Sequence, residues 1–328
     1  MGDKDTLKNI LIAGSIIILI SAGLFYFGYF NAPKNTAALE RFIVPLGFND
    51  TQSEEKLQKE GFVKSAWAFN FALNLKKFGT KIDPGAYKIS KSMNVWRVAE
   101  IISSDPYMKW VVIPEGLRKE EIANILAINL GWSDEVKKNW IEKNTTGDLD
   151  FIEGVYFPDT YLIPKDESPE DVAKRLRLKF EEKFIPYSKE AIKQNIKWTT
   201  VVKMASIIQR EAGSKDDMPL ISGILWNRLN KKMRLDVDCS LQYARGDKGN
   251  GWWAPISLED KKIESPFNLY VNKGLPPNPI SNPGLDALKS VLYPEKTSCL
   301  FYLHDNSKAI HCAKTYEEHL QNIDKYLK

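Results

Sequence analysis

The sequence predicts an α+β protein in three parts: an N-terminal transmembrane helix, two related small α/β modules, and a mixed α+β domain. Three observations lead to this prediction: an uncharged apolar run near the N-terminus, a pattern that returns after 69 residues, and a change after Trp198 to amphipathic helices followed by long polar loops. With 328 residues, the chain is long enough for two or three domains of ordinary size.

The first element is the apolar run 10–30, which holds no charged residue. At about 1.5 Å of rise per residue such a run spans roughly 30 Å, the thickness of the hydrocarbon core of a bilayer. No cleavage site of small residues follows, and the run is longer than the apolar core of a signal peptide, so it is predicted to be an uncleaved anchor. Lys4 and Lys8 precede it, whereas Lys34 is a lone cation behind it. This asymmetry predicts a cytoplasmic tail 1–9 and a single-pass protein of the inner (cytoplasmic) membrane with its large domain outside.

The middle of the chain contains a repeated pattern. F-I-V-P-L-G at 42–47 returns as V-V-I-P-E-G at 111–116, and G-A-Y at 85–87 returns as G-V-Y at 154–156. Helical segments follow each copy, so the order strand, helix, strand, helix occurs twice and predicts two related α/β modules. A module of this size and order resembles the LysM-type glycan-binding fold. A spacer that holds the next domain away from the membrane fits the same pattern.

The third part begins with a short helix that carries an unexpected carboxylate. Plotted at about 100° per residue, Val201, Met204 and Ile208 lie on a broad apolar arc, and Glu211 falls inside that arc. Burial against hydrocarbon disfavours the charged form of a carboxylate, so this side chain can hold a proton near neutral pH and is a candidate general acid. An ion pair with a nearby Arg, or a side chain that reaches water at the helix end, explains the same pattern.

Long polar loops follow this helix. A second amphipathic helix is predicted over 220–230, and a stretch rich in Gly, Trp and Pro comes after it. The segment 274–284 holds six Pro and Gly residues. Because Pro fixes φ and lowers the entropy lost in ordering a loop, this segment is expected to line a cleft.

Composition argues against two classes of function. The formal net charge is only +4 and the Lys residues are scattered, which disfavours binding of nucleic acid. Three dispersed His and three Cys without a C-x-x-C pair predict neither a metal site nor a cofactor. Cys299 and Cys312 flank a predicted hairpin that can bring them near each other, but their spacing does not place them directly opposite, so free buried thiols are favoured over a disulfide.

Several ordered motifs resemble those of one family. They are E-G-V-Y-F-P-D-T-Y at 153–161, A-S-I-I-Q-R-E-A at 205–212, W-N-R-L-x-x-x-M-x-L-D-x-D at 226–238, S-P-F-N-L-Y at 265–270, and G-L-P-P-x-P-I-S-N-P-G at 274–284. In this order and spacing they resemble the YceG-like, or MltG, family of membrane-anchored endolytic murein transglycosylases. The similarity extends from the apolar run to H-C-A-K-T-Y-E-E-H near the C-terminus.

The resemblance implies a LysM-like region and a catalytic domain that cleaves the β-1,4 bond between MurNAc and GlcNAc in peptidoglycan, leaving a 1,6-anhydro end and limiting the length of nascent strands. The catalytic glutamate of the family corresponds to Glu211. Implied partners are glycan strands, the cytoplasmic membrane and, as a further candidate, peptidoglycan synthases; no cofactor is implied. The predicted borders are a tail 1–9, a transmembrane helix 10–30, a first LysM-like module 31–107, a second such module with a connector 108–190, and the catalytic domain 191–328.

Six further residues match polar or aromatic positions of the family motifs and are predicted to orient sugar hydroxyl and N-acetyl groups: Asn227, Asp238, Ser240, Tyr243, Asn268 and Tyr270. Capping or turn roles explain the same positions, and Arg228 is expected to be a structural ion-pair partner. The chain departs from the family at Cys239, where Pro is usual, and at Asn278, where Gly is usual. Gln209 stands where many relatives carry Glu, which points to Glu211 as the acid.

Two other functions fit part of the sequence. A muramidase would use Glu211 with Asp236 or Asp238 as the second carboxylate, and would release a reducing MurNAc end instead of the anhydro sugar. A non-catalytic scaffold would hold glycan with the repeated modules and dock synthases with the C-terminal domain.

Overall fold

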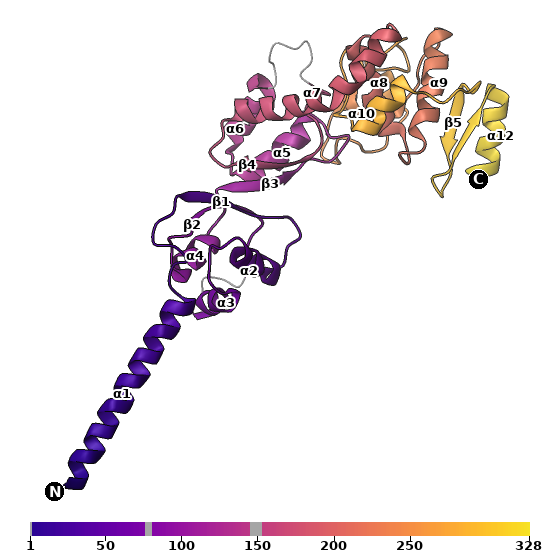
Figure 1. The fold of residues 1–328 in the computed structure, drawn as a ribbon. Coiled ribbons are helices and arrows are strands. Elements are labelled where there is room, and N and C mark those ends of the chain that lie inside the picture. The colour runs from indigo at the N-terminus through magenta and orange to yellow at the C-terminus, as the bar shows by residue number, and fades with distance from the viewer. Residues whose placement is uncertain (1, 76–80, 145–152) are drawn as a thin grey trace. The chain divides into compact units, whose positions relative to one another are not determined.

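The computed structural model describes residues 2–75, 81–144 and 153–328, and it confirms a mixed α+β architecture that begins with an apolar helix (Figure 1). The chain forms two compact units. Unit 1 comprises Met1–Trp110 and Tyr161–Asp166, and unit 2 comprises Val111–Thr160 and Glu167–Lys328. These units do not follow the predicted borders at 107 and 190, which remain a prediction.

Helix α1 (Gly2–Tyr29) is the apolar element. Its segment Leu7–Tyr29 has a mean hydropathy of 2.4, and none of it is buried in the protein, so it is long and apolar enough to cross a membrane. An anchor and a signal sequence both meet these criteria of length and composition. The predicted run extended to Phe30, but the helix ends one residue earlier, and Phe30 is buried in the core of unit 1 instead.

A four-stranded sheet has the order β1-β2-β3-β4, and its strands are β1 (Leu39–Val44), β2 (Gly85–Ser90), β3 (Met108–Val112) and β4 (Thr160–Pro164). β2 runs antiparallel to both β1 and β3. Phe42 of β1 lies opposite Tyr87 of β2, and both side chains are buried. Cross-strand contact between such large side chains stabilises the pairing.

Three helices of unit 1, α2 (Asp50–Lys59), α3 (Ala66–Leu75) and α4 (Val95–Ile102), contribute buried side chains to the same core. α2 begins with a capping box, in which the side chains of Asn49 and Gln52 each accept a hydrogen bond from the other's backbone N–H. The pairs α2–α3 and α3–α4 pack against each other, so α3 lies between its two neighbours in the sequence.

The predicted order strand, helix, strand, helix occurs twice, but each copy has more than one helix between its two strands. In the second copy β3 precedes α5 (Lys119–Leu130), α6 (Asp134–Asn139) and the π-helix η1 (Trp140–Asn144), and β4 precedes α7 (Pro169–Lys193). The G-A-Y motif opens β2, whereas G-V-Y at 154–156 lies before β4, so these two motifs do not occupy equivalent positions. All four strands share one sheet. The LysM-like character of the segments remains a prediction.

Unit 2 is mainly helical, and its further elements are α8 (Trp198–Glu211), α9 (Met218–Asn230), α10 (Asp238–Arg245), η2 (Asp260–Lys262), α11 (Leu285–Leu292), β5 (Phe301–His304), β6 (Ile310–Ala313) and α12 (Tyr316–Tyr326). α11 packs against α7, α8 and α9. On α9, a Cβ at Gly223 would lie 2.2 Å from the Glu295 carbonyl oxygen, so only glycine permits this close approach. The range of α9 confirms the helix predicted over 220–230.

Contrary to the prediction, the segment 274–284 does not line an open cleft over its whole length. Residues 279–284 are buried, and they pack along α8. The Ile280 N–H donates to Ser206 Oγ over 3.0 Å, and the Gly284 N–H donates to Gln209 Oε1 over 2.9 Å. The fixed path of the proline-rich chain thus serves to hold α8 in place.

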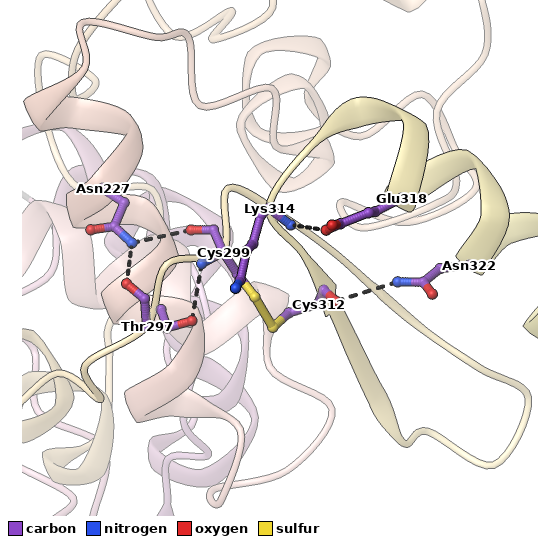
Figure 2. Close-up of a disulfide and its surroundings, with 7 residues drawn as sticks. All are labelled: Asn227, Thr297, Cys299, Cys312, Lys314, Glu318 and Asn322. Carbon is purple, nitrogen blue, oxygen red and sulfur yellow. Dashed lines mark hydrogen bonds between the residues drawn. A yellow bond between two sulfur atoms is a disulfide. The ribbon is translucent and has the colours of Figure 1, made fainter.

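The expectation of free thiols at Cys299 and Cys312 is wrong, because the two residues form a disulfide with a Cα–Cα distance of 5.9 Å (Figure 2). In the β5–β6 register Cys312 lies opposite Tyr302, not opposite Cys299. The chain before β5 nevertheless stays close to β6, since the Leu300 N–H donates to the Ala313 carbonyl over 2.8 Å. Strict strand pairing is therefore not needed for the bond, and Cys239 remains as a buried free thiol.

Candidate functional site

A pocket of about 430 Å³ in unit 2 collects polar and aromatic side chains from the end of α8, from α9 and the segment after it, from α10, η2 and the loop beyond it, and from β5 and α12. It is lined by Glu211, Arg228, Leu235, Asp236, Asp238, Lys261, Tyr270, Phe301, Tyr302, Tyr316 and His319. Three of these residues are acids, and four are Phe or Tyr, so the pocket offers both hydrogen-bonding groups and ring faces to a ligand.

Glu211 is the last residue of α8, and its carboxylate accepts hydrogen bonds from β5 and from α10. The Tyr302 hydroxyl donates to Oε2 over 2.7 Å, and the Cys239 backbone N–H donates to Oε1 over a longer 3.5 Å. The prediction that Glu211 is buried against hydrocarbon is wrong. Val201, Met204 and Ile208 are fully buried, as the apolar arc predicts, but Glu211 ends the helix and its partly exposed side chain faces the polar pocket.

Tyr302 is a neutral donor to Glu211. Burial, together with the nearby charge of Glu211, raises the pKa of the Tyr302 hydroxyl well above its ordinary value. The phenol therefore keeps its proton over the whole physiological range, and it holds one carboxylate oxygen in a fixed direction.

Asp238 and Tyr270 form a second polar pair in the pocket. The Tyr270 hydroxyl donates to Asp238 Oδ1, and the Lys261 ammonium lies 4.5 Å from the centre of the Tyr270 ring. Burial and the hydrogen bond to Asp238 raise the pKa of Tyr270. Asp238 is the first residue of α10, where the helix dipole favours a negative charge.

Asp236 and Arg228 form the wall beside this pair. Asp236 adopts a left-handed backbone conformation with φ of +47°, and its carboxylate lies 3.6 Å from Arg228 Nη1. Arg228 is buried and donates to the carbonyls of Leu300 and Leu235 over 2.5 and 2.6 Å. The structural role expected for Arg228 is therefore confirmed, and most of its partners are backbone oxygens.

Three predicted binding residues, Asn227, Ser240 and Asn268, do not line the pocket. Asn227 donates to the carbonyls of Thr297 and Cys299 over 2.8 and 3.1 Å, beside the disulfide (Figure 2). Ser240 donates to the Val237 carbonyl, and Asn268 bonds to the carbonyls of Lys261 and Ile263. These bonds hold the loops around the pocket, and a direct role of the three residues in binding remains a prediction.

Tyr243 belongs to a different cluster of unit 2. The Arg118 guanidinium lies 4.1 Å from the ring centres of both Tyr243 and Trp252. Nearby, the Glu153 carboxylate is buried, and it accepts hydrogen bonds from the Lys119 N–H over 2.9 Å and from Asn282 Nδ2 over 2.7 Å. Burial raises the pKa of Glu153 to about 8.

Sequence reasoning missed Tyr302, the residue that contacts the predicted acid. It is separated from Glu211 by 91 positions, and no local spacing connects a short strand to the end of a distant helix. Side chains alternate between the two faces of a strand, so Tyr302 and His304 lie on the same face of β5. This alternation could have marked them from the sequence as a candidate pair. His304 bonds to Asp217 instead of the pocket acids, over 3.2 Å.

No group of three or more His, Cys, Asp or Glu side chains suited to a metal ion is found in the described residues. His304 and His311 each bond to an aspartate, and His311 lies 2.8 Å from Asp305. The pocket's own groups can supply acid–base chemistry and hydrogen bonding, because a positioned carboxylate beside a neutral phenol donor can give and take a proton.

The chain thus combines a mixed α+β fold with an acid-bearing pocket. Comparison with known proteins identifies its family. The model of the YceG-like family matches residues 42–325, so the chain belongs to the YceG-like family. Among curated proteins, it is 28% identical to an endolytic murein transglycosylase of Bacillus subtilis (strain 168) over 334 residues, covering 94% of this chain and 91% of the relative. A protein of the same name from Streptococcus pneumoniae (strain D39) is 26% identical over 95% of this chain and 64% of its own length.

A solved structure has a similar fold. A crystal structure of a YceG-like protein from Listeria monocytogenes has a TM-score of 0.59 and 26% sequence identity, and the match covers 87% of this chain and 99% of that one. The family predicted from the ordered motifs is thereby confirmed, and distant homologues in it carry the name endolytic murein transglycosylase.

Proposed function

We propose that this chain is a lytic transglycosylase that cleaves the β-1,4 bond between MurNAc and GlcNAc inside peptidoglycan strands and leaves 1,6-anhydroMurNAc ends. The observation that carries the proposal is the position of Glu211, in a pocket of about 430 Å³ with the Tyr302 hydroxyl 2.7 Å from its carboxylate. The family and the names of the relatives give the substrate class.

One carboxylate is sufficient for this reaction. Protonated Glu211 gives its proton to the glycosidic oxygen, which leaves as the 4-hydroxyl of GlcNAc. The MurNAc 6-hydroxyl attacks C1 of the same sugar and closes the anhydro ring, and the Glu211 carboxylate takes the proton of that hydroxyl. The acid is regenerated, no water is consumed, and the nucleophile is held close to C1 by the sugar ring itself.

The surrounding side chains suit a sugar ligand. Asp238 and Tyr270 present a hydrogen-bonded pair toward the pocket, and Phe301 and Tyr316 add aromatic surface. Aromatic rings pack well against the apolar faces of sugars, while carboxylates and phenols bond to their hydroxyl groups. We propose Asp238 and Tyr270 as residues that orient the glycan, with Asn227, Ser240, Tyr243 and Asn268 as further predicted contributors.

The proposal includes the site of action. Helix α1 is retained as a single-pass anchor in the cytoplasmic membrane, and the rest of the chain lies on the outer side, where nascent glycan strands are made. Support comes from the uncharged run 10–30 and from Lys4 and Lys8 before that run. From this position, cleavage limits the length of strands, and peptidoglycan synthases are candidate partners.

A muramidase reaction is the second candidate, and the presence of Asp238 and Asp236 in the same pocket favours it. Either acid would then activate water or attack C1, and the product would end in a reducing MurNAc. Digestion of purified glycan strands, followed by mass measurement, separates the two reactions because the anhydro product is lighter by one water.

The decisive experiment compares the wild-type chain with Glu211→Gln on the same strands. Glutamine keeps the size of the side chain but cannot donate a proton to the leaving oxygen, so release of anhydro ends should fall roughly 10²-fold or more. The matched control is Glu259→Gln, which changes an exposed carboxylate just before η2, and this variant should cleave normally. Near-normal cleavage by Glu211→Gln would place the acid elsewhere, and a much lower melting temperature would show that Glu211 serves the fold instead.

A further inference from the structure

Helix α3 carries a row of exposed apolar side chains. Trp67, Phe71 and Leu75 are 57%, 42% and 61% exposed, and their spacing of four residues places them along one face of the helix. The opposite face, which includes Phe69 and Leu73, is buried in the core of unit 1. We call Trp67, Phe71 and Leu75 the α3 stripe. A continuous row of large apolar groups on the surface marks a contact site.

The α3 stripe begins against the end of the apolar helix α1. The Trp67 ring centre lies 6.1 Å from that of Phe25 and 6.0 Å from that of Phe30, and Phe71 lies 5.8 Å from Phe30. Lys64, just before α3, donates to the Phe27 carbonyl over 2.7 Å. Since Phe25 is part of the candidate span Leu7–Tyr29, Trp67 touches a residue that lies inside the membrane when α1 crosses it.

The distribution of charge along α3 is compatible with a position at the membrane surface. The helix Ala66–Leu75 contains no charged residue, and Lys64 before it is an exposed cation. The polar residues beside the stripe are Asn70 and Asn74, which bond to each other, while Asn70 also bonds to Glu54 over 2.7 Å. A helix with one face in a protein core, a second apolar face and a cation at its edge suits the boundary between lipid head groups and acyl chains.

We propose that α3 is an interfacial helix, whose α3 stripe inserts into the outer surface of the bilayer that α1 spans. The partner that the α3 stripe contacts is therefore the lipid surface. Trp67, which contacts Phe25 of the span, lies at the boundary between head groups and acyl chains, where amphipathic rings are enriched, and Phe71 and Leu75 lie along the same membrane surface. This inference rests on the proposed retention of α1 as an anchor. It adds a second contact with the membrane that limits how unit 1 can tilt on its anchor.

These observations favour lipid over a second protein as the partner of the α3 stripe. The stripe is continuous with the rings at the end of α1 (Phe25 and Phe30), so any partner that covers it must also lie at the exit of the span. Lipid is present at that position whenever α1 is inserted. A bound protein would shield the stripe from water without giving it contact with lipid, and the experiment below distinguishes these outcomes.

The test uses the full chain in vesicles of phosphatidylcholine and phosphatidylglycerol. Leu75→Cys and the matched control Leu258→Cys, both exposed leucines at 61% and 80%, are labelled with an environment-sensitive NBD group. Cys239 is buried and the other two cysteines form a disulfide, so the unsubstituted chain measures background labelling. Lipids that carry a nitroxide near the head group are then added to quench NBD fluorescence.

We expect blue-shifted emission and at least a twofold stronger quenching by lipid at position 75 than at position 258. Equal and weak quenching at both positions, in a chain that resists alkaline extraction from the vesicles, would overturn the interfacial helix and leave the anchor intact. A blue-shifted but unquenched probe at position 75 would also overturn it, in favour of a protein contact. If alkali extracts the chain, both the anchor and the interfacial helix are overturned, while the glycan-cleaving activity is judged separately from its products.

Discussion

Glu211 and Glu153 are carboxylates of the same unit in opposite environments. Glu211 is partly exposed in a polar pocket and bonds to a phenol, whereas Glu153 is 1% exposed and bonds to a backbone N–H and an amide. Environment decides what a carboxyl group can do, and the partly open one can meet a substrate. Glu153 is enclosed, so its protonation state affects folding, while Glu211 is the group that we propose for catalysis.

The bond from Tyr302 to Glu211 should matter for turnover. A hydrogen bond to a charged group contributes about 1.5–3 kcal/mol, so Tyr302→Phe should lower kcat by roughly tenfold or more with little change in KM. The ring remains, so melting temperature should change little. Tyr293→Phe, at an exposed tyrosine outside the pocket, is the control. A loss confined to KM would show that Tyr302 binds the glycan and does not orient the acid.

Glu153 should make stability depend on pH. Its pKa is raised to about 8 in the folded protein, chiefly by burial, whereas the ordinary value is 4.5. Between these pH values the folded chain therefore binds more protons than the unfolded chain, and the free energy of unfolding falls as pH rises from about 4.5 to about 8. At about 1.4 kcal/mol for each pH unit, the upper bound of this loss is roughly 5 kcal/mol.

Denaturant unfolding at several pH values measures this effect. Glu153→Gln keeps the shape of the side chain and removes the titrating proton, so its stability should fall less than that of the wild type over the same range. Glu259→Gln should follow the wild type, because that carboxylate is exposed. Parallel curves for wild type and Glu153→Gln would mean that Glu153 stays in one protonation state.

At the scale of elements, the β5–β6 hairpin is the part of unit 2 that supplies Phe301 and Tyr302 to the pocket. Two strands of four residues each are marginal by themselves. The disulfide between Cys299 and Cys312 and the packing of α12 on both strands compensate for this. The hairpin thereby holds the Tyr302 hydroxyl against an acid on a different element.

The disulfide should contribute measurably to stability. It closes a loop with a sequence separation of 13, and a cross-link of this length stabilises by about 3 kcal/mol in the chain-entropy account. The double variant Cys299→Ser, Cys312→Ser should therefore lose about 2–3 kcal/mol of unfolding free energy, and dithiothreitol should destabilise the wild type by a similar amount. The same reductant should leave the double variant unchanged; an unaffected wild type would indicate that the bond does not form in solution.

Elements with a strong local pattern could be predicted, and contacts between distant elements could not. The apolar arc of α8 and the helix α9 follow from spacing alone, because 3.6-residue periodicity acts within a few residues. The partners of Glu211 and the bridge of Cys299 depend on how separate segments pack. Asn227 shows the same limit, since its spacing cannot reveal that its amide holds the Thr297 and Cys299 carbonyls.

At the scale of the whole molecule, the repeated pattern predicted the order of the elements better than their grouping. The predicted order of strand, helix, strand, helix occurs twice with added helices between the strands, but β3 and β4 extend the sheet of β1 and β2, and the helices α5 and α7 belong to unit 2. A strand edge pairs with whichever strand lies beside it, so a sequence repeat need not form a separate module. The candidate site lies wholly within unit 2, and the candidate membrane span lies within unit 1.

The last prediction concerns the direction in which the chain crosses the membrane. Lys4 and Lys8 precede the uncharged run 10–30 and favour a cytoplasmic N-terminus, which would place the four-stranded sheet and all of unit 2 outside. Protease added to intact spheroplasts should therefore degrade the chain beyond about residue 35, while a cytoplasmic marker survives. Replacing both lysines by Glu removes the charges that set the orientation, and should protect a fraction of the chain. Complete protection of the wild-type chain would reverse the proposed topology and separate the pocket from its proposed substrate, whereas release of a soluble, shortened chain would show that α1 is removed as a signal sequence.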